Sequence, residues 1–561
     1  MGSHFKFNEA GSTQRRGDAM NISKMSIDDT NIREAFLDIV TRRRPNIFLV
    51  DAITSREIIY GEFHRQACAL AAELRRRGVR KGDRVGVMVP NCCELAVLYF
   101  ACIYLGAVIV PINPALSKTD VQFILANCKP RSIVASVSCV GAITNFEPNV
   151  LRLATARDVI KESKDSDLIR IDALREAGDF VPLETADVED LVAIMYTSGT
   201  SAKPKGLAHK LGSMLRNANA FATAQQIDKD TRFYLTLSMA YMGGFYNLLV
   251  LPFLCGASVV VDHVFDARSS LHFWDKANNN HVNTLWLAPT VLSILLRMDR
   301  GRAGEGFCRS SVRHTFVGFA PLPLKVKHEF ESRYGVRLIE NYGLSETLFV
   351  TARTQDVVEG NGYVGETLPG VALRVVNDAG EPLELDVEGE VQILTPDLMA
   401  GYVDADGRLI EMDASIWFPT GDVGYLDDNG SLFITGRKKD LIIRGGVNIS
   451  PAAIEEELMH IMGVVDVAVV SIPHELYGED IVAVLKLDRG VELESILDLV
   501  LGHAKRNLAQ HQQPARYMAI DELPRTANGK VQKSRIRELV AEKLQVGSLS
   551  SLRTHETRVS A

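Results

Sequence analysis

The stretch Leu191-Val-Ala-Ile-Met-Tyr-Thr-Ser-Gly-Thr-Ser-Ala-Lys-Pro-Lys-Gly206 passes from a run of apolar residues into a loop of hydroxyls, glycines and lysines. A short apolar run that ends in such a loop is typical of a buried strand in an α/β sheet. Backbone N–H groups of the loop can converge on phosphate oxygens, while Thr, Ser and Lys side chains add donors and positive charge. The stretch therefore indicates a candidate phosphate loop, although a polar surface loop has the same composition. It is not a Walker A loop, a pattern that the chain lacks, since Gly529-Lys530 is followed by Val531.

Strand and helix patterns alternate on both sides of this stretch. Residues 63–77 predict an amphipathic helix, residues 83–89 a strand, and the apolar run 132–136 a short buried strand. The alternation continues between residues 249 and 334. Short apolar strands separated by helices indicate an α/β fold with mixed, mostly parallel sheets.

The composition fits a globular chain of several domains. The 561 residues are 46% hydrophobic and 24% charged, and 62 Lys and Arg against 70 Asp and Glu leave a net charge of −8. This balance does not favour nucleic acid as a partner. The apolar run 95–110 is shorter than the ~20 residues of a membrane-spanning helix and is broken at Gly106 and Pro111. We expect a buried helix that runs into a strand there, no transmembrane segment, and a cytoplasmic protein.

Cysteine usage points to a reducing compartment. None of the eight cysteines forms a C-x-x-C pair, and most lie in apolar surroundings. Buried thiols are therefore expected rather than a disulfide scaffold or a zinc site.

The pattern of predicted secondary structure changes near residue 365. From there to about residue 436, short strand patterns are joined by Asp, Asn and Gly turns, which predicts a β-rich subdomain and suggests a distorted barrel. After the charged run Arg437-Lys-Lys-Asp440 the chain regains a βαβ character. We expect a large N-terminal domain at 28–436, a hinge at 437–440, a small mobile α+β domain at 441–545, and disordered tails at 1–27, which begins like an expression tag, and at 546–561.

Four further motifs place polar side chains in turns or after strands. Ile339-Glu-Asn-Tyr-Gly-Leu-Ser-Glu-Thr347 sets Glu346 beside a hydroxyl, a pair that can hold hydrated Mg²⁺ next to a phosphate, and its tyrosine can stack on a purine. Phe418-Pro-Thr-Gly-Asp-Val-Gly424 presents an aspartate suited to accept two sugar hydroxyls. The other two are Gly436-Arg-Lys-Lys-Asp-Leu-Ile-Ile-Arg-Gly-Gly-Val-Asn-Ile449 and Leu523-Pro-Arg-Thr-Ala-Asn-Gly-Lys530. In isolation, a solvated turn acid or a packed tyrosine explains such residues equally well.

Taken in this order, the five blocks resemble those of the adenylate-forming superfamily: acyl-CoA and aryl-CoA synthetases, nonribosomal-peptide adenylation domains and beetle luciferases. The resemblance runs from about residue 30 to residue 540 and is closest to acyl- or aryl-CoA ligases. Five separated blocks in the right order are far more specific than any one of them. The resemblance implies that a carboxylic acid is activated with ATP to acyl-AMP, with release of pyrophosphate. Transfer of the acyl group to the thiol of coenzyme A would follow.

The resemblance also implies a set of site residues. It implies contacts with ATP or AMP from Thr197, Ser198, Gly199, Thr200, Lys205, Gly318, Phe319, Ala320, Asn341, Tyr342, Gly343, Glu346, Thr347, Asp422, Arg437 and Lys530. It implies an acyl pocket from Tyr241, Gly244, Phe319 and Ala320, pantetheine contacts from Gly445 and Gly446, and a hinge at Lys439. It further implies Mg²⁺ ligation by Glu346 and Thr197, and catalytic roles for Lys530, Thr197 and Glu346.

Within this set, individual matches carry individual roles. Tyr342 matches the family's adenine-stacking residue, and Asp422 and Arg437 match its ribose contacts. Thr347 matches an α-phosphate contact, and Lys530 matches the adenylation lysine. Elementary electrostatics supports the last role, because a carboxylate approaches an α-phosphate only when a cation bridges the two anions, and a lysine ammonium is a compact point charge.

The sequence departs from the family pattern in three places. Ala202 stands where the phosphate loop usually has glycine, which we expect to make the loop less flexible. Phe319 replaces the second glycine of the family's Gly-Gly-Ala-Pro-Leu strand and is expected to narrow the pocket. Tyr241 stands at a customary histidine, where it either gates the acyl tunnel or packs in the core. The Phe-Asp-x-Ser pattern that binds an α-ammonium group does not occur in this segment, which disfavours an α-amino acid substrate.

Three functions remain open on the sequence. The leading one is an AMP-forming acid–thiol ligase that uses ATP, Mg²⁺ and coenzyme A. The second is a stand-alone adenylating enzyme that loads the phosphopantetheine of an acyl carrier protein, which presents the same thiol arm. The third is a catalytically silent nucleotide-binding protein, which Ala202 and Phe319 suggest and the retained Lys530 and Glu346 disfavour. The expected small-molecule partner is a carboxylic acid, and the expected assembly is a monomer or a homodimer.

Overall fold

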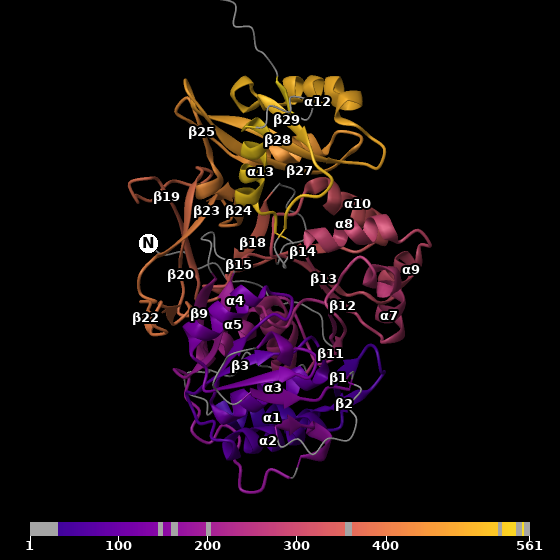
Figure 1. Cartoon of the computed structure of the whole chain (residues 1–561), viewed down its shortest axis with the longest axis vertical. Helices are drawn as coiled ribbons and strands as arrows, with labels where there is room; N and C mark the ends of the chain where they lie inside the picture. Colours follow the sequence, from indigo (N-terminus) through magenta and orange to yellow (C-terminus); the bar gives the residue numbers. More distant parts are fainter. Residues whose placement is uncertain are drawn as a thin grey trace, which may run out of the picture.

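The computed structural model describes residues 32–554 apart from 144–149, 157, 159–166, 175, 198–203, 354–361, 526–529 and 546–551. The predicted N-terminal tail, 1–27, and most of the predicted C-terminal tail, 546–561, lie outside the described residues. In Figure 1 the N-terminal sheets lie at the bottom, and the C-terminal sheet with helices α12 (Leu493–Asn507) and α13 (Lys533–Gln545) lies at the top.

The first large sheet has nine strands in the order β22-β21-β9-β8-β4-β3-β5-β6-β7. Neighbouring strands from β8 to β7 are parallel, whereas β9, β21 and β22 each run antiparallel to their neighbours. The strands are β3 (Arg84–Met88), β4 (Val108–Pro111), β5 (Ser132–Ser136), β6 (Val150–Leu153), β7 (Leu168–Ile169), β8 (Leu191–Thr197), β9 (Lys205–Lys210), β21 (Gly401–Val403) and β22 (Leu409–Glu411). The predicted strands at 83–89 and 132–136 are thus confirmed as β3 and β5.

Helices cover this sheet because their apolar residues match its buried strands. The helices of the N-terminal half are α1 (Ile32–Arg43), α2 (Tyr60–Arg76), α3 (Cys93–Leu105), α4 (Lys118–Cys128) and α5 (Leu211–Ala224). Almost every residue of α3 is buried, so the apolar run 95–110 is a core helix followed by β4, as predicted. Within the described residues, no helix is both long and apolar enough to cross a bilayer. All eight cysteines are free, and all but Cys139 are buried.

A second sheet of seven strands has the order β14-β13-β12-β10-β11-β1-β2, and all its neighbours are parallel except the β1–β2 pair. The strands are β1 (Ile47–Asp51), β2 (Glu57–Ile59), β10 (Arg232–Leu235), β11 (Ser258–Val261), β12 (Thr284–Leu287), β13 (His314–Val317) and β14 (Leu338–Glu340). The helices that accompany them are the π-helix η4 (Gly243–Val250), α6 (Leu251–Leu254), α7 (Phe273–Asn279), α8 (Pro289–Met298), α9 (Ala303–Ser311) and α10 (Leu324–Tyr334).

The β-rich part forms a six-stranded antiparallel sheet in the order β17-β18-β24-β23-β20-β19. The strands are β17 (Thr351–Ala352), β18 (Tyr363–Thr367), β19 (Ala372–Val376), β20 (Gly389–Leu394), β23 (Phe418–Leu426) and β24 (Leu432–Arg437). The distorted barrel suggested by the sequence is not found among the described strands, since β17 and β19 are the two open edges of the sheet. Strand β21 leaves this part of the chain to pair with β9, and β22 pairs with β21, so the two strands extend the nine-stranded sheet at that edge.

The C-terminal sheet has the order β26-β25-β28-β29-β30, with β27 paired antiparallel to β28. Its strands are β25 (Ile442–Arg444), β26 (Val447–Ile449), β27 (Val464–His474), β28 (Gly478–Leu487), β29 (Arg516–Ala519) and β30 (Leu552–Thr554), and α11 (Pro451–Met459) packs beside β27. Two hydrophobic clusters belong to this lobe, and their residues all follow residue 440. The predicted helix at 493–507 is confirmed as α12.

Candidate functional site

The carboxyl ends of four parallel strands place the predicted motifs at one edge of the seven-stranded sheet. β10, β12, β13 and β14 are neighbours, so the segments that follow them meet at that edge. Tyr241 and Gly244 follow β10, Gly318-Phe-Ala320 follows β13, and Asn341 and Tyr342 follow β14. Ligands of open α/β sheets bind outside the carboxyl ends of the strands. This edge is therefore the floor of the candidate site.

Asp422 forms the polar centre of the site. Its side chain is buried, with 2% of its surface exposed. The Tyr342 hydroxyl donates to Asp422 Oδ2 over 2.6 Å, and Arg437 Nε lies 2.7 Å from Oδ1. Adjacent strands supply this ion pair, because Asp422 of β23 and Arg437 of β24 face each other in the sheet register. Three residues from three separate sequence motifs therefore meet in one hydrogen-bonded group.

Burial controls the ionisation of this group. Desolvation raises the pKa of Asp422, while the Arg437 guanidinium and the Tyr342 hydroxyl oppose the rise. Desolvation, reinforced by the Asp422 charge, lifts the pKa of Tyr342 well above its ordinary range. Tyr342 therefore acts as a neutral ring with a hydroxyl donor, a form suited to stacking on a purine.

Glu346 lies in the turn between two short strands, β15 (Gly343–Leu344) and β16 (Leu348–Phe349). A Cβ on Gly343 would lie 2.1 Å from the Leu348 carbonyl oxygen, so this position requires glycine. The Glu346 carbonyl accepts a hydrogen bond from Met399 N over 2.7 Å, which ties the turn to the segment before β21. The backbone of Glu346 is therefore held on both sides.

The Glu346 carboxylate is half-buried and faces Tyr402 of β21. Desolvation raises the pKa of Glu346, and the Tyr402 hydroxyl that donates to the carboxylate lowers it in part, as do Arg437 and Lys530. The neighbouring Thr347 is fully buried, and its hydroxyl accepts from Leu344 N over 3.3 Å inside the turn. The Thr347 side chain therefore serves the turn, and its contact with an α-phosphate stays a prediction.

The two ends of the candidate phosphate loop pair with each other, and one of them lies near the Tyr402 ring that contacts this carboxylate. Thr197 ends β8 and Lys205 begins β9, and the two residues face each other in the sheet register. Lys205 Nζ lies 5.9 Å from the centroid of the Tyr402 ring, whose hydroxyl reaches Glu346. The loop residues Ser198, Gly199 and Thr200, and the Ala202 departure, lie outside the described residues.

Lys530 reaches the same site from the C-terminal lobe. Desolvation and the Arg437 charge lower the pKa of its ammonium, while Asp422 and Glu346 raise it. Lys530 keeps access to solvent, and Arg437, Asp422 and Glu346 lie near enough to its ammonium to shift its pKa. Its flanking residues are fixed, because Arg525 and Val531 form a β-bridge and Gln532 N donates to the Pro524 carbonyl over 2.8 Å.

Polar contacts hold the C-terminal lobe in the placement that delivers Lys530. Glu456 Oε1 accepts from Leu324 N, the first residue of α10, over 3.0 Å. Lys325 Nζ donates to the Met459 carbonyl over 2.8 Å, and an Arg297 Nη2 donates to the Val465 carbonyl over 3.4 Å. A carboxylate at a helix N-terminus is favourable because the first N–H groups of the helix have no partner within it.

Gly445 and Gly446 form the two-residue turn between β25 and β26. Their φ angles are 60° and 84°, as a tight hairpin turn of this kind requires. Both residues are exposed, and among the described residues no atom lies within 4 Å of a Cβ built on Gly446. The structure therefore presents this turn to solvent. Lys439, the predicted hinge, lies in the 3₁₀ turn Lys438–Asp440.

The predicted acyl pocket residues lie around the start of η4. Asn113 Nδ2 donates to Tyr241 Oη over 3.2 Å, which fixes this partly exposed ring at the edge of the sheet. A Cβ on Gly244 would lie 2.3 Å from the Ser238 carbonyl oxygen. Phe319 adopts φ 74°, a left-handed conformation that favours glycine, and its ring packs on Gly243.

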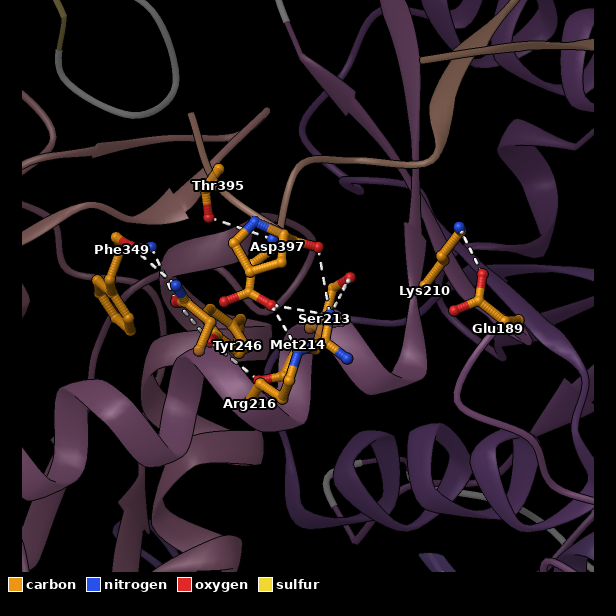
Figure 2. Close-up of polar contacts among 11 residues, drawn as sticks. Glu189, Lys210, Ser213, Met214, Arg216, Tyr246, Phe349, Thr395 and Asp397 are labelled. Atoms are coloured by element: carbon orange, nitrogen blue, oxygen red, sulfur yellow. Dashed lines mark hydrogen bonds and ion pairs between the residues drawn. The ribbon is translucent and has the colours of Figure 1, made fainter. Parts of the chain in front are cut away.

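The sequence analysis missed Tyr402 and a buried polar network on α5. Asn217 and Arg216 of this helix hydrogen-bond to Phe349 and Asp397, respectively (Figure 2). Tyr402 gave no signal, because the pairing of β21 with β9 joins distant parts of the chain. Asn217 gave a weak sequence signal, because it is a polar residue on the buried face of an otherwise apolar helix.

The chemistry that this arrangement permits follows from its charges. Lys205, Arg437 and Lys530 supply positive charge for phosphates, and Asp422 supplies acceptors for hydroxyls. Within the described residues, no group of three or more His, Cys, Asp or Glu side chains is placed to hold a metal by itself. Glu346 together with substrate phosphates fits Mg²⁺ instead, because this ion keeps several waters and takes one or two carboxylates.

Comparisons with known proteins agree with this geometry. The family model described as AMP-binding enzyme matches residues 38–403, and the model described as AMP-binding enzyme C-terminal domain matches residues 453–530. The indoleacetate–CoA ligase of Aromatoleum aromaticum is 31% identical over 494 residues, covering 87% of this chain and 94% of the relative. The medium-chain fatty-acid–CoA ligase of Escherichia coli is 27% identical over 499 residues, covering 86% of each.

A solved relative is similar along nearly its whole length. ATP-bound MatB from Rhodopseudomonas palustris superposes with a TM-score of 0.80 at 26% identity, covering 91% of this chain and 98% of that chain. The apo form of MatB superposes with a TM-score of 0.70, covering 91% and 99%. The described structure is therefore more similar to the ATP-bound form.

Proposed function

Because the chain belongs to the AMP-binding enzyme family, we propose that it is an AMP-forming acyl-CoA ligase. It activates a carboxylic acid with ATP and passes the acyl group to coenzyme A. The observation that carries the proposal is the meeting of Tyr342, Asp422 and Arg437 in one hydrogen-bonded group, with Glu346 and Lys530 facing it. A nucleotide needs these groups together: an aromatic ring, hydroxyl acceptors, a metal ligand and a cation.

In the first half-reaction, Lys530 bridges two anions. An oxygen of the acid's carboxylate attacks the α-phosphorus of ATP, and the bond from that phosphorus to the bridging oxygen of the β-phosphate breaks. The products are acyl-AMP and pyrophosphate. The ammonium of Lys530 offsets the repulsion between the carboxylate and the α-phosphate in a site where desolvation strengthens charge interactions. Lys205 offers a second cation near the departing phosphates.

The remaining residues bind and orient the nucleotide. Asp422 accepts the ribose hydroxyls, and the Arg437 charge favours the ionised form of its buried carboxylate. Tyr342 stacks on adenine between the backbones of Asn341 and Gly343, and Gly318-Phe-Ala320 forms the opposite wall. Thr197, Ser198, Gly199 and Thr200 grip the β- and γ-phosphates, and Thr347 supports the α-phosphate contact.

Glu346 and Thr197 would hold Mg²⁺, because a partly exposed carboxylate and a hydroxyl at the end of β8 are oxygen ligands of the kind that this ion takes together with phosphates and waters. When bound, this ion neutralises charge on the pyrophosphate as it leaves. Glu346 contributes its ionised carboxylate, which Tyr402, Arg437 and Lys530 all stabilise.

In the second half-reaction, the C-terminal lobe turns about Lys439. Lys530 then leaves the site, and the Gly445–Gly446 turn takes its place. The thiolate of coenzyme A attacks the carbonyl carbon of acyl-AMP, AMP leaves, and a thioester forms. The exposed hairpin supports this role, because a turn without side chains lets a narrow pantetheine arm pass close to the backbone. We propose the division of the chain into 28–436, 437–440 and 441–545 on the same grounds.

The test separates the two half-reactions. Pyrophosphate exchange is measured over a panel of carboxylic acids, and thioester formation is then measured with coenzyme A and with a holo acyl carrier protein. We expect exchange with at least one acid and a faster reaction with coenzyme A. Lys530→Ala should lower exchange by about 10²–10³-fold, as expected when one positioned charge is removed, and leave thioester formation from supplied acyl-AMP intact. Absence of exchange with every acid would refute the proposal, and preference for the carrier protein would reassign the acceptor.

A further inference from the structure

Asn217 of α5 binds the backbone of the strand that follows Glu346. Asn217 Nδ2 donates to the Phe349 carbonyl over 2.8 Å, and Phe349 N donates to Asn217 Oδ1 over 2.9 Å. One side chain therefore satisfies both backbone groups of a residue that lies three positions after Glu346. Asn217 is buried, with 1% of its surface exposed, so water does not compete for these bonds.

The Asn217 amide makes a third contact, and its orientation is fixed by the bond from Phe349 N. Tyr246 Oη of η4 lies 2.9 Å from Asn217 Oδ1 and 3.1 Å from the Met214 carbonyl oxygen. A reversed amide would turn its NH₂ group toward Phe349 N, where two donors would face each other. The bond from Phe349 N is therefore consistent with a single orientation of the amide.

The residue before it holds the other side of Glu346. Arg216 Nε donates to Asp397 Oδ1 over 3.1 Å, and an Arg216 Nη2 donates to the Pro396 carbonyl over 3.2 Å. Asp397 N in turn donates to Thr395 Oγ1 over 3.1 Å, which shapes the turn before Met399. Met399 N is the donor to the Glu346 carbonyl. Two consecutive residues of α5 thus reach Glu346 by two separate routes.

The helix that makes these contacts is joined directly to the phosphate-loop hairpin. β9 ends at Lys210 and α5 begins at Leu211, so a shift of α5 also shifts β9 and Lys205 at its start. α5 therefore connects Lys205 through the chain and Glu346 through side-chain bonds. The Lys205 ammonium and the Glu346 carboxylate must both contact the same nucleotide if the proposed function holds.

We propose that Arg216 and Asn217 are positioning residues that hold Glu346 in register with Thr197 and Lys205, so that one metal–nucleotide complex meets both. This proposal rests on the role proposed above for Glu346. The choice of residue supports it, because an amide on a buried helix face costs free energy unless all its hydrogen bonds are made. An apolar residue at 217 would pack more simply, but it would leave Phe349 N and O without these partners.

The test uses the full-length protein and compares Asn217→Ala and Arg216→Gln with Lys210→Ala. Lys210 is a matched control, because it is the last residue of β9, directly before α5, and pairs with Glu189 on the exposed side, away from Phe349 and Asp397 (Figure 2). Calorimetry gives the dissociation constant of ATP with Mg²⁺ and with a chelator, and that of AMP. Kinetics give pyrophosphate exchange and thioester formation from supplied acyl-AMP.

In the two α5 variants we expect the tightening of ATP binding by Mg²⁺ to be lost and exchange to fall ten- to a hundredfold, because a misplacement of about 1 Å can cost roughly 10²-fold. AMP affinity and thioester formation should stay within twofold of the control. Arg216→Gln keeps the test valid if Asn217→Ala does not fold, because Arg216 is partly exposed.

Two outcomes would overturn the proposal. One is that both variants bind Mg²⁺–ATP and exchange pyrophosphate like Lys210→Ala. The other is an equal loss in both half-reactions and in AMP affinity, which marks a merely structural helix. A wild-type protein that shows no Mg²⁺-dependent ATP binding would instead refute the proposed function itself.

Discussion

The ring of Phe319 lies directly on Gly243: a Cβ at Gly243 would be 2.9 Å from two of its ring carbons, Cε1 and Cζ. Phe319 holds this position from a left-handed backbone conformation, which costs a residue other than glycine on the order of 1–3 kcal/mol. A strained residue at the edge where substrate is expected indicates that the ring itself is selected. The ring therefore lies beside the start of η4, where the acyl pocket is proposed.

Phe319→Gly should therefore widen the range of acids. The substitution relieves the backbone strain and removes the ring, so bulkier acids gain room. We expect the kcat/KM ratio of a longer to a shorter acid to rise by about tenfold, since one methylene in an apolar pocket is worth roughly 10–200-fold. The adenylation rates of a homologous series of acids measure it. The apparent melting temperature serves as the control for folding, and an unchanged ratio would mean that the ring is only structural.

Lys530→Arg should remove the alkaline limb of the pH profile of adenylation. Desolvation lowers the pKa of Lys530, so the wild-type ammonium is lost at a lower pH than for a free lysine, and the rate falls as pH rises through that pKa. A guanidinium stays protonated there, although its planar shape makes the variant slower overall. Pyrophosphate exchange across pH measures the effect. An identical alkaline limb in both proteins would contradict the role of Lys530.

Tyr402→Phe should move the acid limb of adenylation to higher pH. The Tyr402 hydroxyl stabilises the ionised form of Glu346, so its removal raises the pKa of this carboxyl further, and a higher pH is needed to ionise it. A hydrogen bond to a charged group is worth about 1.5–3 kcal/mol, which corresponds to about one pH unit or more. Tyr425→Phe, in β23, is the control. A profile that does not move would separate Tyr402 from Glu346.

Gly446→Trp should slow thioester formation alone. The residue has φ 84° and faces open space among the described residues, so the bulky side chain fits the exposed turn at the cost of some backbone strain. We expect thioester formation from supplied acyl-AMP to fall by tenfold or more and pyrophosphate exchange to be unchanged. Gly490→Trp is a matched control, because Gly490 lies in the same lobe with φ 82° and an equally open surrounding. Equal effects of the two substitutions would argue against a pantetheine path.

Local patterns predicted the elements that depend on local chemistry. The helix at 493–507 and the strand at 132–136 match α12 and β5, because apolar periodicity and turn residues define such elements. Asp422 was singled out from its turn as an acceptor for sugar hydroxyls and Arg437 only through the family resemblance, and the structure pairs the two across β23 and β24.

Contacts between segments that are far apart in the chain could not be predicted from local sequence patterns. Tyr402 meets Glu346 only because β21 leaves the β-rich part of the chain and pairs with β9. Asn217 meets Phe349 only because α5 packs on β16. In both cases the packing of one sheet or helix on another brings the two residues together. A short stretch of sequence carries no information about such packing.

The separation of the hydrophobic clusters on the two sides of residue 440 has an energetic consequence. A lobe with its own hydrophobic core does not expose that core to water when its position relative to the N-terminal domain changes. What it gives up are bonds such as those of Glu456 to Leu324 N and of Lys325 to the Met459 carbonyl, which water replaces at a cost of about 1 kcal/mol each. If the lobe turns about Lys439 as proposed, its placements differ mainly by such bonds, and the ligand bound at a given moment decides which placement is occupied.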